Sequence, residues 1–271
     1  MNTLLKRSIT AVVYGIVVLG CALGGKITFP VIGLLFIIIS MLEFLQMSEK
    51  QGLRPLRIYT IFAGVAVFAI TYSWANGLIG YHYFLLLPLL FLALVSAELF
   101  RNKLDSFVNI AISLLAVIYI ALPVSLMSFL VLPGDGTEYD PRLLIYVIVQ
   151  IWAFDTGAYL SGVSFGKHKL SPRLSPNKSW EGIAGGVVFV ILAAVITSTF
   201  YKPFDIPGMV IAAVLVAIGS TLGDLAESML KRNAEVKDSG SLLPGHGGLL
   251  DRIDSLLFVV PLLYVFIWLY K

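Results

Sequence analysis

Long apolar runs alternate with short polar connections along almost the whole chain. Nine windows of about 17–25 mainly apolar residues, the length that crosses a bilayer as an α-helix, predict nine membrane spans. They lie at 8–24, 27–46, 56–74, 78–99, 107–131, 142–163, 182–200, 206–230 and 253–270. Runs such as Leu85–Val95 are apolar on every side, whereas a transmembrane β-strand would alternate. We therefore expect an all-α, polytopic integral membrane protein.

The composition agrees with this class and narrows the chemistry. Hydrophobic residues make up 58% and charged residues 13% of the 271 positions, against about 45–50% and 25% in soluble domains. A net charge of +3 gives the chain no general affinity for nucleic acid. The single cysteine, Cys21, can form neither an internal disulfide nor a cysteine cluster for zinc.

Lysine and arginine are distributed unevenly between alternate connections. If the N-terminus is inside, all 19 basic residues except Lys26, Arg142, Lys202 and Lys271 fall on the inner side. Cytoplasmic loops hold such an excess, so we expect an inner-membrane protein with its C-terminus outside. Two long polar connections, 164–181 and 231–252, are then cytoplasmic. We expect N-terminal membrane helices over 1–100 and a catalytic region over 101–271.

Carboxylates inside predicted spans are functional candidates, because each costs about 2.5–3.5 kcal/mol near the bilayer centre. Glu43 and Glu98 lie near the ends of their spans, and we interpret them as interfacial residues rather than ligands. Asp155 lies well inside the sixth span and must face protein, water or a cation.

The eighth span carries a polar stripe. Ser220, Asp224, Glu227 and Lys231 recur at helical spacing and share one face. An ion pair between Glu227 and Lys231 is the structural alternative to a functional role for those two residues. That alternative leaves Asp224 without a partner.

The first long connection is basic and rich in hydrogen-bond donors. Lys167, Lys169, Arg173 and Lys178 stand among serines and glycines. Such a set suits a polyphosphate, since cations supply charge and hydroxyl and N–H groups supply directed hydrogen bonds. The alternative is that these charges only fix topology or touch anionic headgroups. Composition leaves both open.

The second long connection ends in a cluster of acids at the start of the ninth span. Asp251 together with Asp224 suggests a divalent-metal site, because Mg²⁺ takes one or two carboxylates plus water and substrate phosphates. For Asp254, a helix cap is an equally good interpretation. His246, between glycines, could contact a phosphate, transfer a proton or only shape the loop.

A 27-residue segment over 228–254 resembles the signature of the phosphatidate cytidylyltransferase (CDP-diacylglycerol synthase) family. The matching positions are Ser228, Lys231, Arg232, Lys237, Asp238, Gly240, Leu243, Pro244, His246, Gly247, Gly248, Asp251, Arg252 and Asp254. The stretches 155–159, 175–182 and 223–227 are also similar to this family. Asn177 replaces a lysine of the family pattern, which leaves Lys178 as the better candidate.

The resemblance implies an enzyme that joins CTP to phosphatidic acid and releases pyrophosphate, with Mg²⁺ required. It implies catalytic roles for Asp155, Lys178, Asp224, Lys231, Lys237, Asp238, His246, Asp251 and Arg252. It implies substrate binding by Lys167, Ser175, Lys178, Arg232 and His246, and metal binding by Asp224 and Asp251. A second cation and a homodimer are left open. The alternative is an ion-coupled transporter, for which acids should concentrate at mid-membrane.

Overall fold

The computed structural model describes residues 15–16, 18–101, 105–132, 138–242 and 247–270. Within these residues, eight helices are long and apolar enough to cross a membrane, which confirms the all-α polytopic class. Their ends agree with the predicted spans to about one helical turn. Residues 8–14 and 17 of the span predicted at 8–24 lie outside the described residues, so this span stays a prediction.

The chain divides into two compact units, each made of two sequence segments. The first comprises Met1–Asp140 and Asn233–Arg252, and the second comprises Pro141–Arg232 and Ile253–Lys271. Our expectation of a catalytic region from residue 101 onward concerns function, and it stays a prediction.

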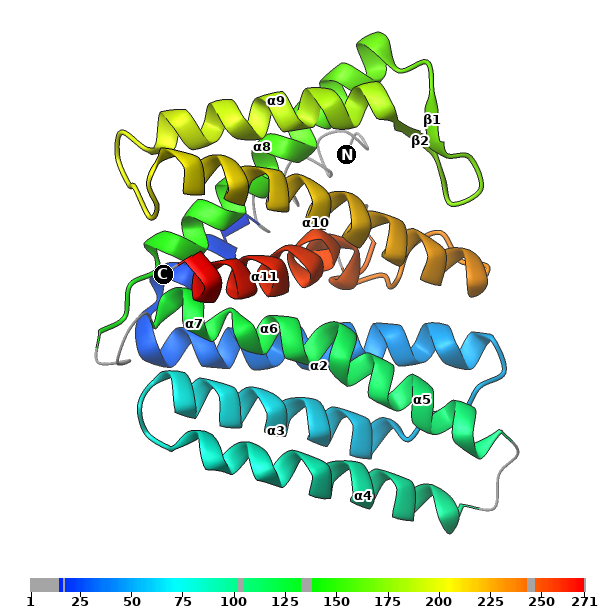
Figure 1. Ribbon diagram of the computed structural model, residues 1–271. Helices are drawn as coiled ribbons and strands as arrows, with labels where there is room; N and C mark the ends of the chain where they lie inside the picture. The colour runs from blue at the N-terminus through cyan, green and yellow to red at the C-terminus, as the bar shows by residue number, and fades with distance from the viewer. Residues whose placement is uncertain (1–14, 17, 102–104, 133–137, 243–246, 271) are drawn as a thin grey trace. The chain divides into compact units, whose positions relative to one another are not determined.

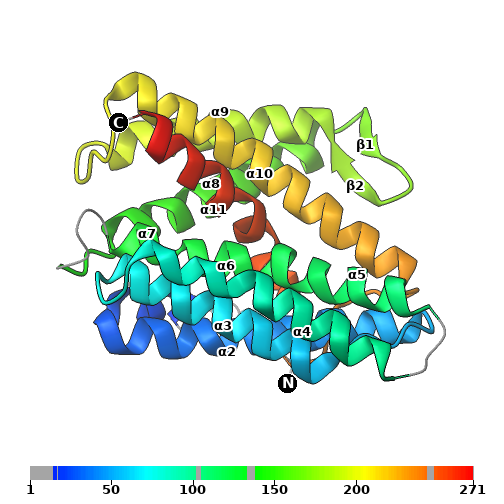
Figure 2. The same cartoon turned by 60° about the horizontal axis from the view of Figure 1, so that its bottom comes forward.

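The first unit contains a group of membrane helices that lie side by side (Figures 1 and 2). Its elements are α2 (Gly25–Lys50), α3 (Arg57–Ala75), η1 (Tyr81–Leu86), α4 (Leu87–Leu99), α5 (Ser106–Ala116), η2 (Val117–Ala121), α6 (Leu122–Leu126) and α7 (Ser128–Val131). Helices α2 and α3 approach closely because Gly33 faces the Phe68 ring and Gly64 faces Met41. Pro123 follows the π-helical turn η2 and explains it, since proline donates no N–H and crowds the preceding turn.

The second unit combines four long helices with one short hairpin (Figure 1). Its elements are α8 (Arg142–Phe165), β1 (Lys169–Ser171), β2 (Ser175–Ser179), α9 (Trp180–Thr197), α10 (Ile206–Asn233) and α11 (Leu250–Tyr270). The strands are antiparallel and occupy the connection that we expected to be a plain polar loop. Helices α8 and α9 pack against each other through Gly157 and Gly186, where a side chain would meet Phe189 or Phe154.

Helices α10 and α11 also touch through glycines. A Cβ at Gly219 would meet the backbone of Val259, and one at Gly223 would meet the backbone of Asp254. Near the other end of this pair, the Asp205 carboxylate accepts hydrogen bonds from the Gly208 N–H (2.9 Å) and the Tyr270 hydroxyl (2.6 Å). The Tyr270 hydrogen bond is the largest of the effects that hold the pKa of Asp205 below its ordinary value. The two helices are therefore fixed to each other near both ends of their contact.

Candidate active site

A cleft of about 560 Å³ lies within the second unit. Helix α8 contributes Asp155 and Tyr159 to its lining, and α10 contributes Thr221 and Asp224. The hairpin supplies five further lining residues, Lys169, Ser175, Asn177, Lys178 and Ser179. The cleft thus combines cations, carboxylates and neutral hydrogen-bonding groups from segments far apart in the sequence.

An ion pair between Lys178 and Asp224 crosses this cleft from the hairpin to α10. Both side chains are partly accessible, so the pair is not sealed inside the protein. Asp155 interacts electrostatically with both partners. The structure therefore brings together three of the predicted site residues and supplies the partner that the sequence had left missing for Asp224.

Local hydrogen bonds hold the hairpin against α9. Ser179 caps α9, because its hydroxyl accepts a hydrogen bond from the Gly182 N–H at 3.2 Å. The Glu181 carboxylate accepts the backbone N–H groups of Lys167 and His168, each at 3.1 Å. These contacts anchor the two ends of the connection and so determine where Lys178 lies. The Lys167 side chain is exposed and does not line the cleft.

Asp254 joins this group from α11. Its buried side chain lies within hydrogen-bonding reach of Asp224. Because α11 begins at Leu250, Asp254 lies in the second turn, and its interpretation as a helix cap is wrong. Two carboxyl groups in contact need a proton or a cation between them. Ser220, one turn before Asp224, is buried and its hydroxyl has no hydrogen-bond partner among the described residues.

These oxygen atoms fit a hard divalent cation. No group of three or more His, Cys, Asp or Glu side chains is placed to hold a metal in the part of the chain that the structure describes. Mg²⁺ needs fewer protein ligands, because water and substrate phosphates complete its shell. Asp251 belongs to the first unit and Asp224 to the second, so the metal pair that we predicted stays a prediction.

The remaining predicted site residues that the structure describes do not line the cleft. Lys231 pairs with Glu227 at 2.6 Å, so the ion pair forms, and the catalytic role expected for Lys231 stays a prediction. Arg232, Lys237, Asp238 and Arg252 are exposed. His246 lies outside the described residues.

In the first unit, Glu43 of α2 binds the segment that carries the family-like signature. Its carboxylate, on a residue only 6% exposed, accepts the N–H groups of Leu249 (2.9 Å) and Leu250 (2.8 Å). The Ser239 hydroxyl donates to it at 3.0 Å. A side chain at Gly240 or Gly248 would collide with the same carboxylate. Residues 239–240 and 248–250 of the signature therefore pack around Glu43.

Asp251 completes this arrangement from the start of α11. One of its carboxylate oxygens accepts the backbone N–H groups of Ser239 (2.9 Å) and Gly248 (2.7 Å). Interpreting Glu43 as an interfacial residue was wrong, because it is buried and bound to distant backbone. The same interpretation fails for Glu98, which is buried and contacts Arg101 at 2.7 Å and Asn109 at 3.0 Å. For both residues, the sequence signal of a buried role was the presence of a carboxylate within a predicted span.

The fold and the cleft define a multi-pass membrane protein with a site suited to phosphate chemistry. The chain belongs to the Cytidylyltransferase family, whose model matches residues 5–270. This membership of an enzyme family decides against the transporter alternative.

Relatives that carry the name phosphatidate cytidylyltransferase are similar over most of the chain. The protein from Staphylococcus haemolyticus is 33% identical over 96% of this chain and 97% of its own length. The one from Bacillus subtilis is 34% identical over 98% of both chains. The one from Haemophilus influenzae is 51% identical over 44% of this chain and 43% of its own.

Replacing Glu43 with alanine should destabilise the protein by about 1–3 kcal/mol, because buried N–H groups lose their acceptor. Thermal unfolding of the full chain in detergent measures this effect. Glu138→Ala, which removes an exposed carboxylate, is the matched control and should stay within about 0.5 kcal/mol of the parent. Equal unfolding temperatures for both variants would contradict the anchoring role of Glu43.

Proposed function

We propose that this protein transfers CMP from CTP to phosphatidic acid, giving CDP-diacylglycerol and pyrophosphate. The observation that carries the proposal is the cleft in which Lys178 meets Asp224 beside Asp155, in a chain of the Cytidylyltransferase family. The names of relatives that match nearly the whole chain support phosphatidic acid as the acceptor.

Charge neutralisation is the main task of such a site. Two unit charges 4 Å apart repel by about 1 kcal/mol in water and about 4 kcal/mol at an effective dielectric near 20. Lys169 and Lys178 line the cleft and offset this repulsion when phosphatidate meets the triphosphate. Ser175 and Asn177 provide hydrogen-bond donors for directed contacts with phosphate oxygens.

The reaction needs no covalent enzyme intermediate. A phosphate oxygen of phosphatidate attacks the α-phosphorus of CTP, and the bond from that phosphorus to the bridging oxygen breaks as pyrophosphate leaves. The residues of the cleft act by positioning the two substrates and stabilising the charge on the leaving group. Lys178 is the cation best placed to stabilise the charge on the leaving pyrophosphate, because its ammonium group already contacts an anionic oxygen, that of Asp224.

The carboxylates of the site would hold Mg²⁺. Asp224 and Asp254 supply adjacent oxygens, with the Ser220 hydroxyl one turn away on α10. Asp251, the partner expected from the sequence, is retained as a further candidate ligand. When bound, the metal supplies positive charge to the phosphates of CTP.

The site would open to both water and lipid on the cytoplasmic face of the inner membrane. The hairpin is basic, and cytoplasmic loops hold the excess of lysine and arginine, so the proposed orientation puts the hairpin on the cytoplasmic side. Tyr159 and Val163 of α8 line the cleft and are exposed, as is Trp180 at the start of α9. This apolar surface suits the acyl chains of a substrate that enters sideways from the bilayer.

Asp224→Asn and Asp254→Asn should each lower turnover of CTP and phosphatidate by at least about 100-fold and raise the Mg²⁺ concentration for half-maximal rate. Each change removes charge with little change in size. The double variant should be scarcely worse than either single variant, since residues that act as one unit are not additive. An assay with labelled CTP across a Mg²⁺ series measures these effects.

Glu138→Gln is the control for the loss of one carboxylate elsewhere and should retain the parent rate. Thermal unfolding in detergent must show that the site variants are folded. Parent-like rates with unchanged Mg²⁺ dependence in both site variants would rule out this metal-centred proposal.

The proposed orientation predicts opposite labelling of two engineered cysteines in a Cys21→Ser background. Lys202→Cys, between α9 and α10, should react with a membrane-impermeant thiol reagent on intact cells. Ser175→Cys, in the hairpin, should react only after the membrane is opened. Labelling of position 175 in intact cells would place the cleft on the other face.

A further inference from the structure

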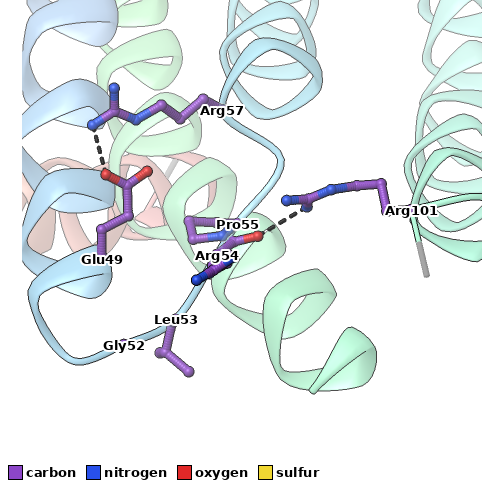
Figure 3. A pocket seen from close by; sticks show the side chains of 7 residues that line it. All are labelled: Glu49, Gly52, Leu53, Arg54, Pro55, Arg57 and Arg101. Atoms are coloured by element: carbon purple, nitrogen blue, oxygen red, sulfur yellow. Dashed lines mark hydrogen bonds and ion pairs between the residues drawn. The ribbon is translucent and has the colours of Figure 1, made fainter. Parts of the chain in front are cut away.

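A second cleft, of about 500 Å³, lies in the first unit where α2 connects to α3 (Figure 3). Its lining residues are Glu49, Gly52, Leu53, Arg54, Pro55, Arg57 and Arg101. The lining thus contains three arginines and a single carboxylate, which pairs with Arg57. None of these residues belongs to the cleft of the second unit, so this site is independent of the proposed function.

Buried polar groups hold the backbone of this cleft in place. The Arg54 N–H donates to the Asn109 side chain at 2.8 Å, and Asn109 in turn donates to Glu98 at 3.0 Å. The Arg101 guanidinium donates to the Arg54 carbonyl at 2.8 Å, as Figure 3 shows. Because both Asn109 and Glu98 are buried, Arg54 stands on a fixed scaffold.

Positive charge remains after the ion pairs of the cleft are counted. Glu49 pairs with Arg57 at 2.7 Å, and Glu98 pairs with Arg101 at 2.7 Å. The exposed Arg54 side chain has no ion pair among the described residues. A guanidinium has five N–H donors in a planar fork, so these arginines can still bind an anion with two or more oxygens. A phosphate group has that geometry.

We infer that this cleft binds the phosphate of an anionic phospholipid headgroup. Apolar side chains beside the arginines favour a lipid over free phosphate. Ile58 follows Arg57 and is 82% exposed, while Leu99 and Phe100 precede Arg101 and are 74% and 89% exposed. These side chains offer the acyl chains a surface next to the charged cleft, at the end of the spans that the orientation places in the cytoplasmic leaflet.

Arg54→Gln tests the inference with least risk to folding, because the scaffold contacts of Arg54 use only its backbone. The full chain in neutral detergent is titrated with dioctanoyl phosphatidylglycerol, and binding is followed by native mass spectrometry. The variant should bind this lipid about fivefold more weakly than the parent, the effect of one basic residue at a membrane surface. Unfolding temperature without lipid should be unchanged.

Lys50→Gln is the matched control, since Lys50 is exposed on α2 next to Glu49 but does not line the cleft. It should retain parent affinity. Equal weakening by Lys50→Gln and Arg54→Gln, or no weakening by Arg54→Gln, would overturn the site. Equal binding of dioctanoyl phosphatidylcholine would overturn its preference for anionic lipid. Displacement of the lipid by inorganic phosphate at constant ionic strength would assign the cleft to free phosphate instead.

Discussion

A carboxylate among membrane helices must have a partner, and this constraint organises both units. Glu43 accepts hydrogen bonds from two backbone N–H groups and a serine hydroxyl. Glu98 forms an ion pair with an arginine and accepts a hydrogen bond from an asparagine. Asp224 forms an ion pair with Lys178. In each case a group from another segment offsets the cost of placing a charge among membrane helices, fully buried for Glu43 and Glu98 and partly accessible for Asp224. The pairings therefore also connect segments that the sequence separates.

The same constraint explains the shape of the cleft in the second unit. Lys178 reaches Asp224 because Ser179 and Glu181 fix the hairpin against the start of α9. Glycines bring α10 and α11 close enough for Asp254 to approach Asp224. One cation and two adjacent carboxyl groups then share a small volume. Such a group is stable when another cation or a proton enters, which suits a site that binds a metal with a phosphate.

The sequence predicted the spans well, because long apolar windows depend on composition alone. It also identified Asp155, Lys178, Asp224 and Ser175, all of which line the cleft. It could not predict the partner of Glu43, because Ser239 lies 196 residues away and no local pattern connects them. Asp254 was partly misinterpreted because the start of α11 is uncertain from the sequence. The hairpin has no alternating apolar pattern and so gave no strand signal.

The contact between Lys178 and Asp224 is the central claim of this account, and a double-mutant cycle tests it most directly. The free energy of unfolding in mixed micelles is measured for the parent, Lys178→Met, Asp224→Asn and the double variant. Residues in direct contact should show a coupling energy of about 0.5–3 kcal/mol, whereas distant residues add. A coupling of zero within error would contradict the ion pair and, with it, the architecture of the cleft.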